Sequence, residues 1–164
     1  DWRSDGVFSG LIVPRPGLWP ESIQSNLASA EAARNFVAMT HPGAGAFDQL
    51  HALDYLIYAY LQGAQDRKAK EILDQANALD KVDAEVIAAA YAFAAIPVRY
   101  ALDRRQCSES SNLIVHSISF PWDHFRYSVS IMYFARAYGA ALRRNTAATR
   151  IDADILAPFL QPLP

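Results

Sequence analysis

The sequence predicts an all-α protein built from antiparallel helix hairpins, and the evidence is clearest between residues 51 and 80. Two segments there carry hydrophobic residues at the three- and four-residue spacing of a helix with one apolar stripe. The first stripe is Leu53, Leu56, Ile57, Tyr60 and Leu61, and the second is Ala69, Ile72, Leu73, Ala76 and Leu79. Only residues 63–66 separate the two segments, and so short a connection requires the helices to lie antiparallel.

Composition supports one folded domain. The chain has 164 residues, of which 52% are hydrophobic and 20% charged, and this is enough to bury a core without disulfides or metals. A net charge of -2 provides no basic field for nucleic acid or for an acidic membrane. The longest uncharged run, residues 86–98, contains Pro97 and is shorter than the roughly 20 residues that cross a bilayer. We therefore expect neither a nucleic-acid partner nor a membrane span, and no cofactor.

The sequence divides into an irregular N-terminal arm, residues 1–16, and a helical domain, residues 17–164. Glycines and prolines interrupt any helical period in the arm, and its apolar part is expected to pack onto the body or onto a second copy of the protein. A single cysteine, Cys107, cannot form an internal disulfide, and no leader segment is present in the printed sequence. Both features favour a cytoplasmic location.

The helical domain is expected to begin with one helix from Gly17. Its predicted apolar stripe is Trp19, Ile23, Leu27, Ala30 and Ala33. Residues 40–46 contain Pro42 and two glycines and should end this helix. In the hairpin that follows, Gly63 is expected to end the first helix and Asp66 to cap the second.

Two further hairpins are predicted in the second half of the chain. Asp80 or Asp83 should cap a long helix over residues 86–105, which Pro97 should bend, and residues 107–117 should form a shorter returning helix. A last long helix is expected over residues 124–144. A turn at Asn145 and Thr146 should lead into a closing helix that contains Ile151, Ile155 and Phe159.

The spacing of residues in the first hairpin resembles the tetratricopeptide repeat. The matching positions are Tyr60, Ala64, Ala69, Leu73, Ala76, Leu79 and Asp80. From about Gly17 onward the chain is also similar to a group of poorly characterised bacterial tetratricopeptide-type proteins. The small residues Ser22, Ala69, Ser110 and Thr149 give repeat spacings of 69 − 22 = 47, 110 − 69 = 41 and 149 − 110 = 39, longer than the usual repeat. The resemblance implies three hairpins after a lone helix, stacked as a short right-handed superhelix.

The resemblance also implies a binding groove lined by the first helix of each hairpin. The groove positions are His51, Asp54, Tyr58, Gln62, Arg99, Asp103, Phe134 and Tyr138. Tyr58, Arg99 and Tyr138 would occupy equivalent places in successive units, and tyrosine and arginine are frequent at binding hot spots. The alternative is that the groove is filled by the N-terminal arm or by the closing helix.

Catalytic interpretations of the sequence are weaker. His51 and Asp54 lie three residues apart on one helical face, which suits a base with its orienting carboxylate or two metal ligands, but no second pair accompanies them. Cys107 with His116 or His124 lies in no known nucleophile motif.

The sequence therefore predicts an interaction module that binds a protein or peptide and is not an enzyme. Self-association as a homodimer is the first alternative, because a short array with an incomplete first unit leaves apolar surface uncovered. A small-molecule-binding protein or enzyme is the second, and would need an enclosed pocket with converging polar groups.

Overall fold

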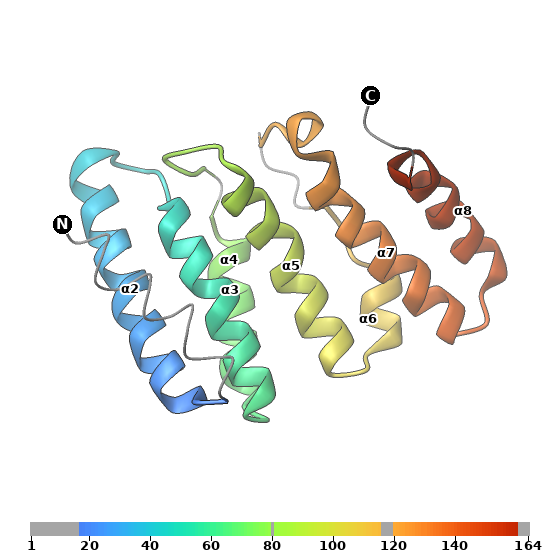
Figure 1. Ribbon diagram of the computed structural model, residues 1–164, viewed down its shortest axis with the longest axis horizontal. Coiled ribbons are helices and arrows are strands. Elements are labelled where there is room, and N and C mark those ends of the chain that lie inside the picture. The colour runs from blue at the N-terminus through green and yellow to red at the C-terminus, as the bar shows by residue number, and fades with distance from the viewer. Residues whose placement is uncertain (1–16, 80, 116–119, 161–164) are drawn as a thin grey trace.

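The computed structural model describes residues 17–79, 81–115 and 120–160, and within these residues all regular structure is helical (Figure 1). One isolated parallel β-bridge, between Gly45 and Val82, joins two loops. The predicted all-α class is confirmed. The arm at residues 1–16, Asp80 and His116 lie outside the described residues.

The helices form one single helix followed by three pairs. Helix α2 (Trp19–Thr40) stands alone at the N-terminal end. The pairs are α3 (Phe47–Gln62) with α4 (Asp66–Asn77), α5 (Ile87–Asp103) with α6 (Cys107–Ser111), and α7 (Arg126–Leu142) with α8 (Thr146–Leu156). Short 3₁₀ helices, η1 (Trp122–Phe125) and η2 (Ala157–Leu160), precede α7 and follow α8. Figure 1 shows α2, α3, α5 and α7 side by side in one row, with α4 and α6 behind it and α8 at the far end.

The turns inside the three pairs have the same backbone structure. Each contains a residue in the left-handed conformation, Ala64, Arg105 or Arg144, with φ between 53° and 59°. The next residue donates its backbone N–H to a carbonyl five residues earlier: Gln65 to Tyr60, Gln106 to Ala101 and Asn145 to Ala140. These are Schellman motifs, which satisfy the last carbonyls of a helix. They recur at 105 − 64 = 41 and 144 − 105 = 39 residues, the two spacings that the sequence predicts for these units.

The main core lies between α3, α4 and α5. It is built from large side chains that are at most a few per cent exposed, and these include Leu50, Leu53, Leu56, Ile57, Phe93 and Ile96. Phe120 and Trp122 extend it as an aromatic layer in contact with Phe93. A smaller cluster of Ala94, Val98, Met132 and Ala135 joins α5 to α7.

The buried face of α2 differs from the predicted stripe at one position. Leu27 is 47% exposed, whereas Ser22 and Asn26 are buried, and the Asn26 side-chain amide donates to the Ser22 carbonyl. The burial of Ser22, Asn26, Ala30 and Ala33 puts small or self-bonded side chains against α3. Small residues let two helices approach closely, so steric fit here outweighs hydrophobicity.

Two of the predicted helix caps are wrong. Asp66 lies inside the first turn of α4, and the residue in the capping position is Gln65, whose side chain makes no cap hydrogen bond. Asp83 caps α3, not α5, because its Oδ1 accepts the Phe47 backbone N–H at 2.8 Å. The bridge between residues 45 and 82 brings the two loops together and makes this contact geometrically possible.

The returning helix predicted over residues 107–117 is much shorter, since α6 ends at Ser111. Ser111 Oγ and Asn112 Nδ2 both donate to the Ser108 carbonyl at the end of this helix. Such side-chain bonds compete with continued helix formation.

Helix α6 packs closely against α7 at Gly139. A Cβ on Gly139 would lie 2.8 Å from the Cys107 carbonyl oxygen. Glycine at this position therefore lets α6 lie directly against α7.

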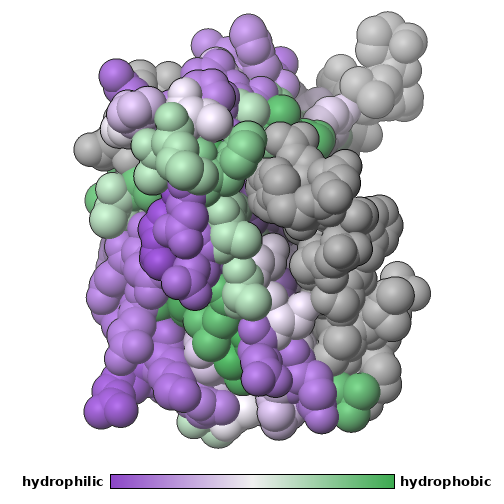
Figure 2. Space-filling view, turned by 90° about the vertical axis from the view of Figure 1, so that its left-hand side faces the viewer, coloured by the Kyte–Doolittle hydropathy of each residue, from purple (hydrophilic) through white to green (hydrophobic). Residues whose placement is uncertain are grey.

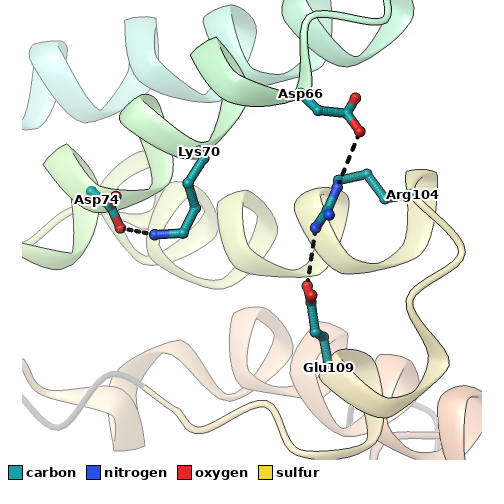
Figure 3. Close-up of polar contacts among 5 residues, drawn as sticks. All are labelled: Asp66, Lys70, Asp74, Arg104 and Glu109. Atoms are coloured by element: carbon teal, nitrogen blue, oxygen red, sulfur yellow. Dashed lines mark hydrogen bonds and ion pairs between the residues drawn. The ribbon is translucent and has the colours of Figure 1, made fainter.

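Arg104 connects the helices of the back layer (Figure 3). Its Nε donates to Asp66 Oδ2 of α4 at 3.3 Å, and its Nη1 donates to Glu109 Oε2 of α6 at 3.2 Å. The guanidinium also lies 4.3 Å from the centre of the Tyr100 ring. One side chain at the end of α5 thus links two successive helix pairs, while the nearby ion pair of Lys70 and Asp74 stays within α4.

Candidate binding face

The candidate site is the side of α3, α5 and α7 that is turned away from α4 and α6. We call it the α3–α5–α7 face, and it is the side of the row seen in Figure 1. Tyr58, Arg99 and Tyr138 each precede the left-handed residue of their own turn by six positions, 64 − 58, 105 − 99 and 144 − 138. These three residues therefore occupy the same position relative to their turns.

The structure separates the eight predicted groove residues into three environments. Asp54 is buried, whereas His51, Tyr58 and Arg99 are half-buried. The remaining four are exposed: Gln62, Asp103, Phe134 and Tyr138.

An ion pair joins α3 to α5 at the centre of the face. Arg99 Nε donates to Asp54 Oδ1 at 2.9 Å, and Arg99 Nη2 lies 3.5 Å from Asp54 Oδ2. Nη2 also donates to the hydroxyl of Tyr91 at 3.1 Å. The Asp54 side chain is 7% exposed and that of Arg99 is 28% exposed. One side of the Arg99 guanidinium therefore contacts a buried carboxylate, and the other side faces the protein surface.

Burial governs the electrostatics of this pair. Desolvation raises the pKa of Asp54 above its ordinary value of 3.8, although Arg99, and to a smaller extent His51, act in the opposite direction. Burial, the largest single influence, would lower the pKa of Arg99, but the charge and hydrogen bond of Asp54 together with Tyr91 and Asp103 outweigh it and raise the pKa. Desolvation also raises the pKa of Asp103. Arg99 thus remains a cation, and Asp54 is the group that responds to acid.

Aromatic rings surround the ion pair. The Arg99 guanidinium lies 5.3 Å from the centre of the Tyr58 ring, a cation–π geometry. Trp19, at the start of α2, meets the same tyrosine edge to face at 5.6 Å between ring centres. Trp19 is therefore a packing residue, as predicted. His51 makes an edge contact with Tyr55, 5.2 Å between ring centres.

Helix α7 carries the most exposed aromatic side chains of the face. Phe134 and Tyr138 are 55% and 48% exposed, and their rings are stacked, 6.1 Å apart and 17° from parallel. Tyr127 and Leu142 are also exposed and extend this line toward both ends of the helix. The positions 127, 131, 134, 138 and 142 follow the three- and four-residue helical spacing. The result is a continuous apolar stripe along α7.

Tyr91 and Tyr127 belong to this face but were not among the predicted residues. Tyr91 precedes Arg99 by two helical turns, and Tyr127 precedes Phe134 by two helical turns. Extending each predicted pair toward the start of its helix by two helical turns, eight residues in α5 and seven in α7, would have found both residues.

Two residues named in the catalytic alternatives, Asp54 and Cys107, make other polar contacts in the structure. The Cys107 thiol donates to the Arg105 carbonyl at 3.7 Å. The described residues include no cluster of three or more histidine, cysteine, aspartate or glutamate side chains placed to share a metal ion. Asp54 is held by Arg99 and Arg99 by two partners, so this pair is organised as a structural link.

The chain matches no known protein-family model, no curated protein and no solved structure. Within the described ranges, no helix is both long enough and apolar enough to cross a membrane.

Proposed function

We propose that the protein is a tetratricopeptide-like interaction module that binds an apolar, aromatic-bearing segment of another protein across the α3–α5–α7 face. The observation that carries the proposal is the stacked pair of Phe134 and Tyr138, because about half of each side chain is exposed. Exposed contiguous apolar surface marks interaction sites, and aromatic residues dominate binding hot spots.

Three equivalent helix pairs support the tetratricopeptide-like part of this proposal. The repeated turns at Ala64, Arg105 and Arg144 impose the same reversal at 41- and 39-residue intervals. Successive first helices α3, α5 and α7 therefore lie side by side and present one surface. Such an array displays an extended face to one long partner segment.

The structure of the face favours a rigid binding surface at the α3–α5 side. Arg99 is held by Asp54 and Tyr91 and stacks on Tyr58. A side chain that is already ordered loses little conformational entropy when a partner binds. We therefore assign positioning to the Arg99 cluster, and direct contact with the partner to the α7 stripe.

Site-specific photo-crosslinking in host-cell lysate tests this proposal. A photoreactive phenylalanine analogue would replace Phe134 or Tyr138, and in a matched control it would replace Met39, which is 77% exposed on α2. We expect one adduct of the same mass from the two α7 positions and none from Met39. The same adduct from all three positions, or none from α7, would contradict the proposal.

Self-association is the second candidate, and the N-terminal end of the array provides its observation. Figure 2 shows that on this end hydrophobic residues form a band between hydrophilic ones. Leu27 and Met39 of α2, and Leu18 just before it, are exposed. A second copy of the chain could cover this surface, and in the crosslinking experiment it would give an adduct of twice the monomer mass from Met39.

A further inference from the structure

A cavity of about 550 Å³ lies at one edge of the molecule, where the end of α5 and the start of α6 meet the last turns of α7. Its volume is within the range of roughly 300–1,000 Å³ typical of small-molecule sites. It is distinct from the ion pair of the α3–α5–α7 face, but it shares Tyr138 and Leu142 with the α7 stripe of that face. Nothing in the proposed function uses it.

The walls of the cavity are mostly apolar. Leu102 comes from α5, and Leu142 and the ring of Tyr138 come from α7. Gly139 forms part of the floor, where its missing Cβ lets the start of α6 lie against α7. These groups favour a ligand with an aliphatic chain, because burying such a chain removes apolar surface from water.

Apart from the hydroxyl of Tyr138, the polar side chains of the cavity lie in the turn between α5 and α6 and at the start of α6. Arg105, Gln106 and Cys107 line the cavity on this side, and among its described lining residues none is acidic. The neighbouring Arg104 is engaged elsewhere, with Asp66 and Glu109, as Figure 3 shows. Arg105 is therefore the charged group available to this cavity, and it favours an anion.

We propose that this cavity binds an aliphatic carboxylate, with the chain between Leu102, Tyr138 and Leu142 and the carboxylate on Arg105. A planar guanidinium can bind a carboxylate through two parallel hydrogen bonds. Arg105 is not part of the α3–α5–α7 face. A test of carboxylate binding at Arg105 can therefore fail or succeed independently of the peptide-binding proposal.

The left-handed turns provide a matched pair of variants for the test. Arg105 and Arg144 both have φ near +55° to +59°, a conformation that glycine adopts without strain. Substituting glycine at either position should therefore relieve the same backbone strain. Only Arg105 lines the cavity, so Arg105→Gly should weaken ligand binding while Arg144→Gly should leave it unchanged.

The experiment is a titration of the native protein with sodium octanoate, below its micelle concentration, followed by two-dimensional amide NMR. We expect saturable shifts concentrated in residues 101–107 and 138–142, and much smaller shifts with acetate or octylammonium. Octanoate should also slow alkylation of Cys107 by iodoacetamide, because Cys107 lines the cavity. Arg105→Gly should bind octanoate about tenfold more weakly, the effect of losing one charge-assisted contact.

Three results would overturn the inference. One is a set of octanoate shifts spread over the whole molecule. Another is equal binding of octanoate and octylammonium. The third is an Arg105→Gly variant that binds octanoate as tightly as the Arg144→Gly control.

Discussion

The half of the array made by α3, α4 and α5 and the half made by α7 and α8 bury very different side chains. Helices α3 and α5 bury large residues, among them Leu53, Leu56 and Ile96, each at most 1% exposed. In α7 the buried residues are Ser128, Met132, Ala135, Gly139 and Ala140. In α8 the buried residue is Asp152, while Ile151 and Ile155 are exposed.

The difference separates a structural body from a surface that is built for contact. Close packing of alanine, glycine and Met132 holds α7 against its neighbours and leaves Tyr127, Phe134, Tyr138 and Leu142 exposed. Helix α8 is attached by an ion pair, in which Arg136 Nη2 lies 3.1 Å from Asp152 Oδ1. The free energy of unfolding should therefore depend on the apolar volume buried in the first half. In the second half, the exposed large side chains are not part of the core and can serve other roles.

The largest effect that we expect from this comparison is the loss of stability on truncating a core side chain. Leu56→Ala removes a fully buried side chain in α3 and should lower the free energy of unfolding by roughly 3 kcal/mol, since it leaves a cavity in a packed core. Ile151→Ala on α8 removes a similar apolar volume from an exposed position and should change it by about 0.5 kcal/mol or less. Urea unfolding followed by circular dichroism measures both. Equal losses would show that α8 is part of the core and would remove the distinction between the two halves.

A smaller effect is expected at the ion pair of Asp54 and Arg99. Asp54→Ala, which removes the carboxyl group and leaves Arg99 without it, should cost about 1–2 kcal/mol at neutral pH, less than for a fully buried pair, because Arg99 retains contact with solvent. The matched control is Asp74→Ala, which removes an exposed pair with Lys70 and should cost under about 0.5 kcal/mol.

The pH dependence of the stability gap between the native protein and the Asp54→Ala variant has a definite sign. The pKa of Asp54 is raised in the folded state above its ordinary value of 3.8, so the folded protein binds this proton more readily than the unfolded chain does. The contribution of Asp54 to stability therefore grows as the pH falls toward 3.8, and the gap between native protein and variant should widen on acidification. Thermal unfolding at several pH values measures this gap. A gap that narrows would show that attraction to Arg99 outweighs burial.

Local sequence patterns predicted the helices and their order well. Apolar spacing placed α3, α4, α5 and α7 within a few residues of their ends, and short connections predicted the three pairs. The Asn145 cap was predicted as a turn, and its side chain accepts the Ala148 backbone N–H. These features depend on residues that are neighbours in the chain.

Contacts between distant residues could not be predicted in the same way. Asp83 caps α3 across 36 positions, because two loops meet only in the folded protein. Nothing in the sequence around Asp54 shows whether its carboxylate is exposed in a groove or buried against Arg99. The exposure of Leu27 depends on which face of α2 fits α3, and periodicity alone assigns hydrophobic residues to the inside.

The smallest predicted effect concerns the turn of the first helix pair. The glycine of this turn, Gly63, lies one residue before the left-handed position, which Ala64 occupies. Gly63 has φ −85°, which any residue adopts, whereas Ala64 has φ +53°. Ala64→Gly should relieve the left-handed strain and stabilise the protein by roughly 0.5 kcal/mol. A Cβ on Gly63 would approach Gln65 Nε2 at 3.1 Å, the end of a flexible side chain that can move aside.

The exchange of the two residues, Gly63→Ala with Ala64→Gly, keeps the composition of the chain and tests the turn alone. Alanine at position 63 restricts the unfolded chain, and glycine at position 64 removes the strain, so the two gains should add to about 1 kcal/mol. Unfolding midpoints of the single and double variants measure this sum. If Ala64→Gly instead lowers stability, the flexibility of glycine in the unfolded chain outweighs the strain. The left-handed turns at Arg105 and Arg144 would then carry no relievable strain either.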